Sequence, residues 1–162
     1  MYGRLDPATG AMQVFDAPHG PGPYGITAAL DGSVYFASLA GSYIARIDTE
    51  KGTATVIEPP TPRQGAQRVW ADSRGRVWGS EWNAGQVAVY DPSTGAFREW
   101  RLPGVRPQAY AVCVDDEDMV WLSDFGANAL VRFDHTRETF AVLPLPSRNR
   151  NVRQMLGRPG EV

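Results

Sequence analysis

The sequence has almost no cysteine and no long apolar run. Cys113 is the only cysteine among 162 residues, so the chain cannot form an internal disulfide. No stretch of about 18 apolar residues is present, which excludes a transmembrane helix. The first residues, M-Y-G-R-L-D-P-A-T-G, lack the apolar core of a signal peptide, which says nothing about a longer parent chain. The compartment therefore stays open between the cytosol and a periplasmic or secreted location.

The sequence also lacks an excess of charge of one sign. Lys and Arg number 16 against 18 Asp and Glu, which gives a net charge of −2. Nucleic-acid-binding domains and proteins that bind anionic membranes carry a basic excess, so we expect neither partner. Glycine (17) and proline (13) are abundant, and both favour turns over long helices.

One turn-like segment recurs along the chain with a nearly constant period. The segments D-P-A-T-G, D-T-E-K-G, D-P-S-T-G and D-H-T-R-E are spaced by 42, 43 and 43 residues. Two further series keep a spacing of 43 residues, namely Tyr35, Trp78 and Trp121, and Gly32, Gly75 and Asp118. Three series that share one period indicate an internal structural repeat.

Each period contains four short segments with the pattern of β-strands. In the second complete unit they span 68–72, 77–80, 86–90 and 97–102, and turn residues separate them. No window has the i, i+3, i+4 spacing of an amphipathic helix. Four strands in about 40 to 45 residues are typical of a propeller blade. We therefore predict an all-β fold, a β-propeller of four-stranded antiparallel blades.

The register of the repeat divides the chain into a half blade, three whole blades and the start of another. The predicted ranges are 1–17, 22–60, 66–103, 108–146 and 152–162. Closed propellers have about four to eight blades, and an open arc would expose unpaired strand edges. We therefore expect this arc of three to four blades to belong to a longer propeller, with self-association of arcs into a ring as the alternative.

Several segments of the repeat carry a family resemblance. P-Y-G-I-T-A-A-L-D-G-S-V-Y-F, S-Y-I-A-R-I-D, R-V-W-G-S-E-W-N-A-G-Q-V-A-V-Y-D and F-R-E-W-R-L-P resemble the virginiamycin B lyase (streptogramin lyase) family. The pattern is shared with NHL-type propellers, whereas no Gly-His and Trp-Asp pair of the WD40 type recurs. The resemblance implies a seven-bladed propeller and a carbon–oxygen lyase that opens a cyclic depsipeptide by β-elimination at an ester. It also implies Mg²⁺ held by glutamates and a histidine base.

The positions that match the family's functional residues occur once in each blade. The catalytic histidine matches Tyr24, Arg68, Tyr110 and Gln154. The metal-binding glutamate two residues earlier matches Gly22, Ala66, Gln108 and Val152. The second glutamate, at the end of the second strand, matches Leu39, Glu81 and Asp124. The resemblance thus assigns no catalytic base to this segment, and it leaves Glu81 and Asp124 as candidate metal ligands.

The same positions predict a ligand site at the mouth of the channel. In a propeller, the start of the first strand and the end of the second share one face, so Tyr24, Arg68 and Tyr110 should lie with Glu81 and Asp124. One basic and two acidic groups beside aromatic rings suit a small-molecule or peptide-like ligand. In the alternative interpretation, both carboxylates are turn residues paired with Arg or backbone N–H groups.

The histidines and a basic cluster have simpler interpretations. His19 lies in a Pro/Gly-rich linker and His135 in a hairpin turn, so we expect both on the surface. Arg148, Arg150 and Arg153 form the only basic cluster. We expect solvated loop charge there, and binding of an anion or carboxylate is the alternative.

Three functions stay open at this point. The first is a lyase of the streptogramin type. The second is a sugar-lactonase-like hydrolase, which needs a metal held by Glu, Asp and Asn side chains facing the channel. The third is a non-catalytic NHL-like module that binds a ligand or a protein.

Overall fold

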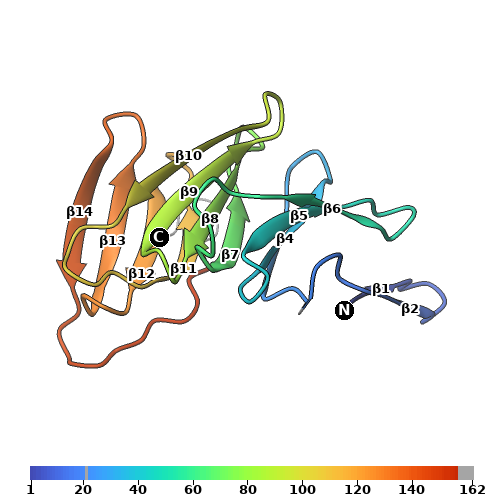
Figure 1. Cartoon of the computed structure of the whole chain (residues 1–162), viewed down its shortest axis with the longest axis horizontal. Coiled ribbons are helices and arrows are strands. Elements are labelled where there is room, and N and C mark those ends of the chain that lie inside the picture. The colour runs from blue at the N-terminus through green and yellow to red at the C-terminus, as the bar shows by residue number, and fades with distance from the viewer. Residues whose placement is uncertain (21, 157–162) are drawn as a thin grey trace.

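The computed structural model describes residues 1–20 and 22–156, and these residues form fourteen β-strands and no helix (Figure 1). None of them belongs to a helix that could cross a membrane. The predicted all-β fold is confirmed. Residues 157–162, which the repeat assigns to the start of a further blade, lie outside the described residues.

The strands form one hairpin and three antiparallel sheets of four strands, each in sequence order. The hairpin consists of β1 (Tyr2–Leu5) and β2 (Met12–Phe15). The first sheet consists of β3 (Gly25–Ala28), β4 (Val34–Ser38), β5 (Tyr43–Ile47) and β6 (Ala54–Ile57). The second consists of β7 (Ala66–Ala71), β8 (Val77–Glu81), β9 (Gln86–Asp91) and β10 (Ala96–Arg101). The third consists of β11 (Ala109–Val114), β12 (Val120–Asp124), β13 (Ala129–Asp134) and β14 (Thr139–Pro144).

Aspartates of the recurring turn close the hairpins between third and fourth strands. Asp48, Asp91 and Asp134 each accept a backbone N–H from the residue two positions later, as expected of Asx turns. Gly52 and Gly95 follow at φ +74° and +73°, a conformation that costs glycine little. In the last turn Glu138 takes this place at φ +55°, and its carboxylate accepts a hydrogen bond from Arg98 of the neighbouring sheet.

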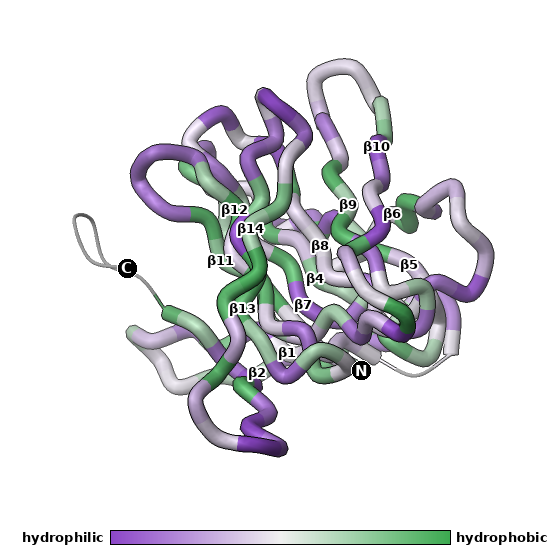
Figure 2. The backbone as a smooth tube through the Cα atoms, turned by 90° about the vertical axis from the view of Figure 1, so that its left-hand side faces the viewer, coloured by the Kyte–Doolittle hydropathy of each residue, from purple (hydrophilic) through white to green (hydrophobic). Residues whose placement is uncertain are grey.

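The sheets stand side by side, with β7–β10 between the other two (Figure 1). Strand β7 contacts both β3 and β11, so the first strands of the three sheets are neighbours. The hydrophobic stretches run along the strands, and the connecting turns are mostly hydrophilic (Figure 2). Because the first strands of the three sheets are neighbours, the first strand of each sheet is the inner strand and the fourth strand is the outer one.

Two members of the aromatic series, Tyr35 and Trp78, pack between adjacent sheets. Tyr35 belongs to a cluster with Val69 and Phe97 of the second sheet. Trp78 is 0 % exposed and packs against Phe133 of the third sheet at a ring distance of 6.2 Å. Burial of large rings is the main driving force for packing one blade on the next.

His135 differs from its prediction as a surface residue, because it packs at the contact between the second and third sheets. Its ring lies 5.3 Å from the ring of Trp78, and its Nε2 lies 3.2 Å from the guanidinium of Arg76. Burial, followed by the charge of Arg76, lowers the pKa of His135. The hairpin turn that carries this histidine reaches across to the neighbouring sheet, which sequence spacing alone does not show.

Candidate functional site

Two inner strands are irregular at the same end. The pairing of β7 with β8 shifts register between Ala66 and Arg68, and the pairing of β11 with β12 shifts between Ala109 and Val112. A β-bulge leaves a residue out of the ladder and changes the direction of its side chain, and such bulges are frequent beside functional sites.

Serine hydroxyls of the second strands hold these bulges in place. Ser80 accepts a hydrogen bond from the Arg68 N–H at 3.1 Å and donates one to the Tyr110 carbonyl of the next sheet at 2.5 Å. Ser123 accepts one from the Ala111 N–H at 2.9 Å. Both serines are buried. The bulged backbone groups are therefore satisfied inside the protein, as buried polar groups require.

Tyr24 and Tyr110 form a hydrogen-bonded pair at this end of the inner strands. Tyr110 is 6 % exposed; its ring stacks on Phe125 at 4.6 Å and meets the edge of Trp82 at 5.6 Å. Tyr24 is 43 % exposed. Aromatic packing thus fixes the inner phenol, while the outer phenol faces solvent.

Two guanidinium groups flank the tyrosine pair. The Arg68 guanidinium lies 5.1 Å from the centre of the Tyr24 ring, and that of Arg153 lies 5.8 Å from the centre of the Tyr110 ring, both within cation–π range. Burial alone would raise the pKa of Tyr110. The hydrogen bond from Tyr24 and the charges of Arg153 and Arg68 more than offset this, so the pKa of Tyr110 is lowered. The hydrogen bond to Tyr110, together with burial, raises the pKa of Tyr24.

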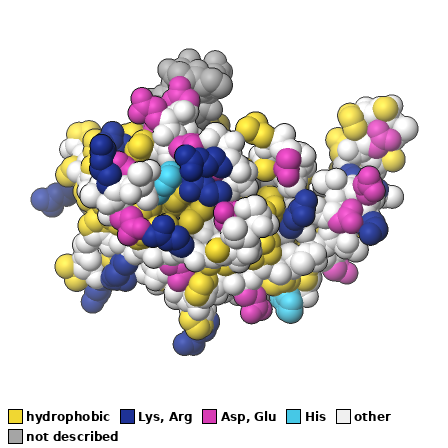
Figure 3. All heavy atoms as spheres, turned by 90° about the horizontal axis from the view of Figure 1, so that it is seen from above, with side chains coloured by type: hydrophobic (Ala, Val, Ile, Leu, Met, Phe, Trp, Pro, Cys, Tyr) yellow, Lys and Arg dark blue, Asp and Glu magenta, His cyan; other side chains and the backbone are white. Residues whose placement is uncertain are grey.

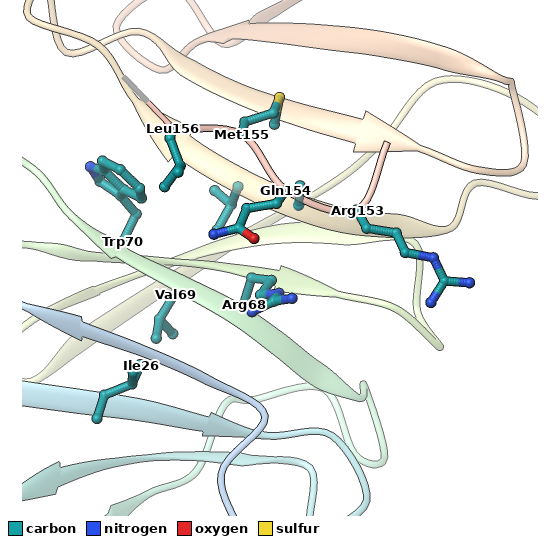
Figure 4. A pocket seen from close by; sticks show the side chains of 10 residues that line it. Ile26, Arg68, Val69, Trp70, Arg153, Gln154, Met155 and Leu156 are labelled. Carbon is teal, nitrogen blue, oxygen red and sulfur yellow. The ribbon is translucent and has the colours of Figure 1, made fainter. Parts of the chain in front are cut away.

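A small cavity of about 100 Å³ adjoins this cluster (Figure 4). Its lining includes Ile26 of β3, Arg68 and Trp70 of β7, and the segment from Arg153 to Leu156. The cavity therefore lies between inner strands of neighbouring sheets and the chain that follows β14. Gln154, one of the residues that match the family's histidine position, belongs to this lining.

Glu81 is buried at the end of β8, opposite Ala66. Its Oε2 accepts a hydrogen bond from Gln86 of β9 at 3.1 Å, whereas its Oε1 is buried without a partner. Burial, with a smaller contribution from the charge of Glu99, raises the pKa of Glu81 to about 8. The side chain therefore holds a proton at neutral pH, and its partner lies on the third strand of the sheet.

Asp124 fastens the backbone on both sides of the third sheet's first hairpin. Its Oδ1 accepts the Gln108 N–H at 2.8 Å and the Gly126 N–H at 2.9 Å, and its Oδ2 is buried without a partner. These contacts match the alternative interpretation of Asp124 as a turn residue that accepts backbone N–H groups.

The structure brings three of the five predicted ligand-binding residues into one cluster: Tyr24, Arg68 and Tyr110. Glu81 and Asp124 lie at the same end of the sheets but are buried, with exposed fractions of 1 % and 2 %. Within residues 1–20 and 22–156, no three His, Cys, Asp or Glu side chains gather as metal ligands would. Glu81 and Asp124 alone do not fit the Mg²⁺ site that the resemblance implies.

Three positions differ by one residue from the predicted register of the blades. Strand β4 ends at Ser38, so Ser38 and not Leu39 corresponds to Glu81 and Asp124. Gln67 lies 43 residues from both tyrosines, and Arg153 lies 43 residues after Tyr110. The buried side chain of Gln67 acts to lower the pKa of both phenols. Counting successive periods of 43 residues from Tyr24 reaches Gln67, Tyr110 and Arg153, and the predicted ligand site lacked Gln67 and Arg153.

Substitution of Gly126 by Ala is expected to destabilise the turn that Asp124 holds. A Cβ at this position would lie 1.8 Å from the backbone oxygen of Arg106, so the backbone must move at a cost of about 1–3 kcal/mol. Gly79→Ala is the control, because its Cβ would meet only ordinary contacts, the nearest at 3.7 Å. Urea unfolding followed by tryptophan fluorescence measures both, and equal stability of the two variants would contradict the predicted clash.

Comparisons with known proteins agree on one family and one fold. The model of the virginiamycin B lyase family matches residues 2–153. The structure of virginiamycin B lyase from Staphylococcus aureus is similar, with a TM-score of 0.85 and 21 % identity over 94 % of this chain and 51 % of that one. A catalytically inactive His-to-Ala variant of that enzyme, solved with quinupristin, gives the same values.

A streptogramin B lyase structure is also similar, with a TM-score of 0.74 and 25 % identity over 82 % of this chain and 43 % of that one. The chain spans about half the length of the lyases from Staphylococcus aureus that it matches. No curated protein sequence matches the chain. Together with the three sheets, these similarities establish the predicted β-propeller fold.

Proposed function

The chain belongs to the virginiamycin B lyase family, and on this premise we propose that it supplies ligand-binding blades to a carbon–oxygen lyase acting on a cyclic depsipeptide. The observation that supports this proposal is the cluster of Tyr24 and Tyr110 with two guanidinium groups at the inner strands. Aromatic faces, phenol hydroxyls and fixed positive charge are the groups that a peptide-like ring with ester and amide carbonyls needs.

Each group of the cluster has a distinct part in this proposal. The exposed ring of Tyr24 offers an apolar face to the ligand, and its hydroxyl orders the phenol of Tyr110. The guanidinium of Arg68 stabilises negative charge that develops on a carbonyl oxygen when a proton leaves the adjacent carbon. These residues bind and orient the ligand.

The described blades do not supply the histidine base of the family. His19 is exposed beside Tyr43 at a ring distance of 5.8 Å, and His135 packs on Trp78. The proposal therefore places proton abstraction outside residues 1–20 and 22–156. A non-catalytic ligand-binding propeller is the second candidate, because the matching inner-strand positions carry Tyr24, Arg68 and Tyr110.

Quinupristin, the compound solved with the inactive relative, is the probe for this proposal. Incubation with a complete propeller that joins these blades to a blade carrying the histidine base is expected to yield a ring-opened product with the mass of the starting compound, because β-elimination breaks the ester without adding atoms. Mass spectrometry with chromatographic separation measures it. A product heavier by one water would identify a hydrolase, and retention without conversion in equilibrium dialysis would identify a binding module.

Tyr24→Phe is expected to weaken quinupristin binding about three- to tenfold, the equivalent of one hydrogen bond. Tyr90→Phe is the matched control, because Tyr90 packs against Phe97 at 5.1 Å in the second sheet, away from the tyrosine pair. Equilibrium dialysis gives both dissociation constants. An equal loss in the two variants would remove the tyrosine pair from the ligand site.

A further inference from the structure

Arg68 and Arg153 differ from several other arginines of the chain because they meet no carboxylate in the described part of the structure. Arg76, Arg98 and Arg137 each pair with an Asp or Glu. On the face seen in Figure 3, basic and acidic side chains are interspersed. No ion pair involves Arg68 or Arg153 among the described residues, and no Asp or Glu lines the cavity that they share.

Arg68 also has a hydrogen-bond donor that the protein leaves unused. Its Nε is buried without a partner, and a buried donor without an acceptor is costly and rare. The guanidinium packs over the ring of Tyr24, 5.1 Å from the ring centre. An oxygen acceptor in the cavity would satisfy this donor.

The cavity has the size and the walls of a site for one small group. Its volume of about 100 Å³ is well below the roughly 300–1,000 Å³ of pockets that enclose drug-sized ligands. Its lining combines the apolar side chains of Ile26, Trp70, Met155 and Leu156 with Arg68, and Arg153 lies at its edge (Figure 4). The cavity is open to solvent on one side, since Ile26 and Leu156 are exposed, so a small anion can enter it from water.

The phenol of Tyr110 responds to the same positive field. The charges of Arg153 and Arg68 both act to lower its pKa, so both guanidinium groups lie close enough to influence an oxygen between the inner strands. The positive field of the two guanidinium groups therefore favours negative charge on an oxygen placed between the inner strands.

We propose that this cavity binds a carboxylate or phosphate group between Arg68 and Arg153. Guanidinium groups recognise both kinds of anion through paired N–H donors, and Gln154 offers a further amide donor in the lining. This inference goes beyond the proposed lyase function, because it requires only an anionic group and no cleavage. It applies equally to a free anion and to an acidic group on a larger ligand.

Titration with inorganic phosphate and with acetate, at constant ionic strength set with chloride, tests the proposal. We expect saturable heat in isothermal calorimetry with at least one of them, and the stronger response identifies the preferred class. Arg153→Gln is expected to weaken this binding about ten- to a hundredfold, as loss of a charge-assisted contact implies. Arg153 is exposed, so this substitution leaves the core packing intact.

Arg150→Gln is the matched control, because Arg150 belongs to the same loop but does not line the cavity. Its affinity for the anion should equal that of the unchanged protein. The proposal would be overturned if the heat of titration with phosphate and acetate did not saturate, or did not exceed the heat with chloride alone. It would also be overturned if Arg150→Gln weakened binding as much as Arg153→Gln. Neither result depends on quinupristin turnover, so failure here and failure of the lyase proposal are separate.

The absorbance of tyrosinate gives a second readout that a general salt effect would not produce. A bound anion offsets the guanidinium charges, so the pKa of Tyr110 should rise on saturation with the anion. The shift should be absent in Arg153→Gln at the same concentration. An unchanged tyrosinate titration at saturating anion would contradict placement of the anion beside Arg153.

Discussion

The unchanged protein is expected to lose about 5 kcal/mol of stability between pH 4.5 and about 8, and the variant Glu81→Gln is expected not to show this loss. The folded protein keeps a proton on the Glu81 carboxyl up to about pH 8, whereas the unfolded chain releases it near 4.5. Between these values unfolding releases a proton, so stability falls by about 1.4 kcal/mol for each pH unit.

The sign follows from the raised pKa of the folded state. The stabilising contribution is complete below pH 4.5, decreases through the interval, and is absent above about 8. The amide introduced by Glu81→Gln carries no charge at any pH, so this variant should be more stable than the unchanged protein above pH 8. The shape of the side chain and its contact with Gln86 are retained.

Urea unfolding at pH values on either side of the interval measures the effect as a difference between the two proteins. Glu138→Gln is the control, because Glu138 is exposed and its pKa is lowered, chiefly by its hydrogen bond from Arg98. That variant should not gain stability at high pH. Parallel pH profiles for Glu81→Gln and the unchanged protein would show that the carboxyl is ionised in the fold.

Trp78→Ala is expected to destabilise the protein by about 3–5 kcal/mol, the usual cost of deleting a fully buried large ring. Trp78 stacks on Trp100 at 6.0 Å and meets Phe133 of the next sheet at 6.2 Å. Its indole N–H donates to Asp72 at 2.8 Å. The substitution therefore opens a cavity between two sheets and removes a donor from a buried carboxylate.

Trp121→Ala separates these two contributions. Trp121 occupies the same position one period later and donates to Asp115 at the same distance of 2.8 Å, but it is only partly buried. We expect a smaller loss, because the hydrogen bond disappears without an equal loss of packing between sheets. Urea unfolding measures both variants, and equal losses would assign the stability to the hydrogen bond.

The sequence predicted the sheets well because their signals are periodic. Asp48, Asp91 and Asp134 mark the same turn in successive sheets, and Trp78 of the 43-residue aromatic series lies in the core. Alternation and turn chemistry are local properties that a single sequence displays. Such signals establish the order and length of strands without any knowledge of the neighbouring blade.

The site was harder to predict because it depends on departures from the period. The bulge in β7 lies between Ala66 and Arg68, so comparison of segments selected Arg68 and omitted Gln67. The sequence places Glu81 beside the inner strand but not the direction of its side chain, whose partner is Gln86. Contacts between blades, such as that of His135 with Trp78, join residues far apart in the chain and carry no local signal.

The one-period spacing of Tyr24, Gln67, Tyr110 and Arg153 has an evolutionary consequence. Copying a blade by duplication also copies one position that points at the same small region, and each copy can then diverge alone. The frame of strands and serine hydrogen bonds does not depend on the side chain at that position. A propeller of this kind can therefore acquire a new ligand preference through single substitutions at intervals of one repeat.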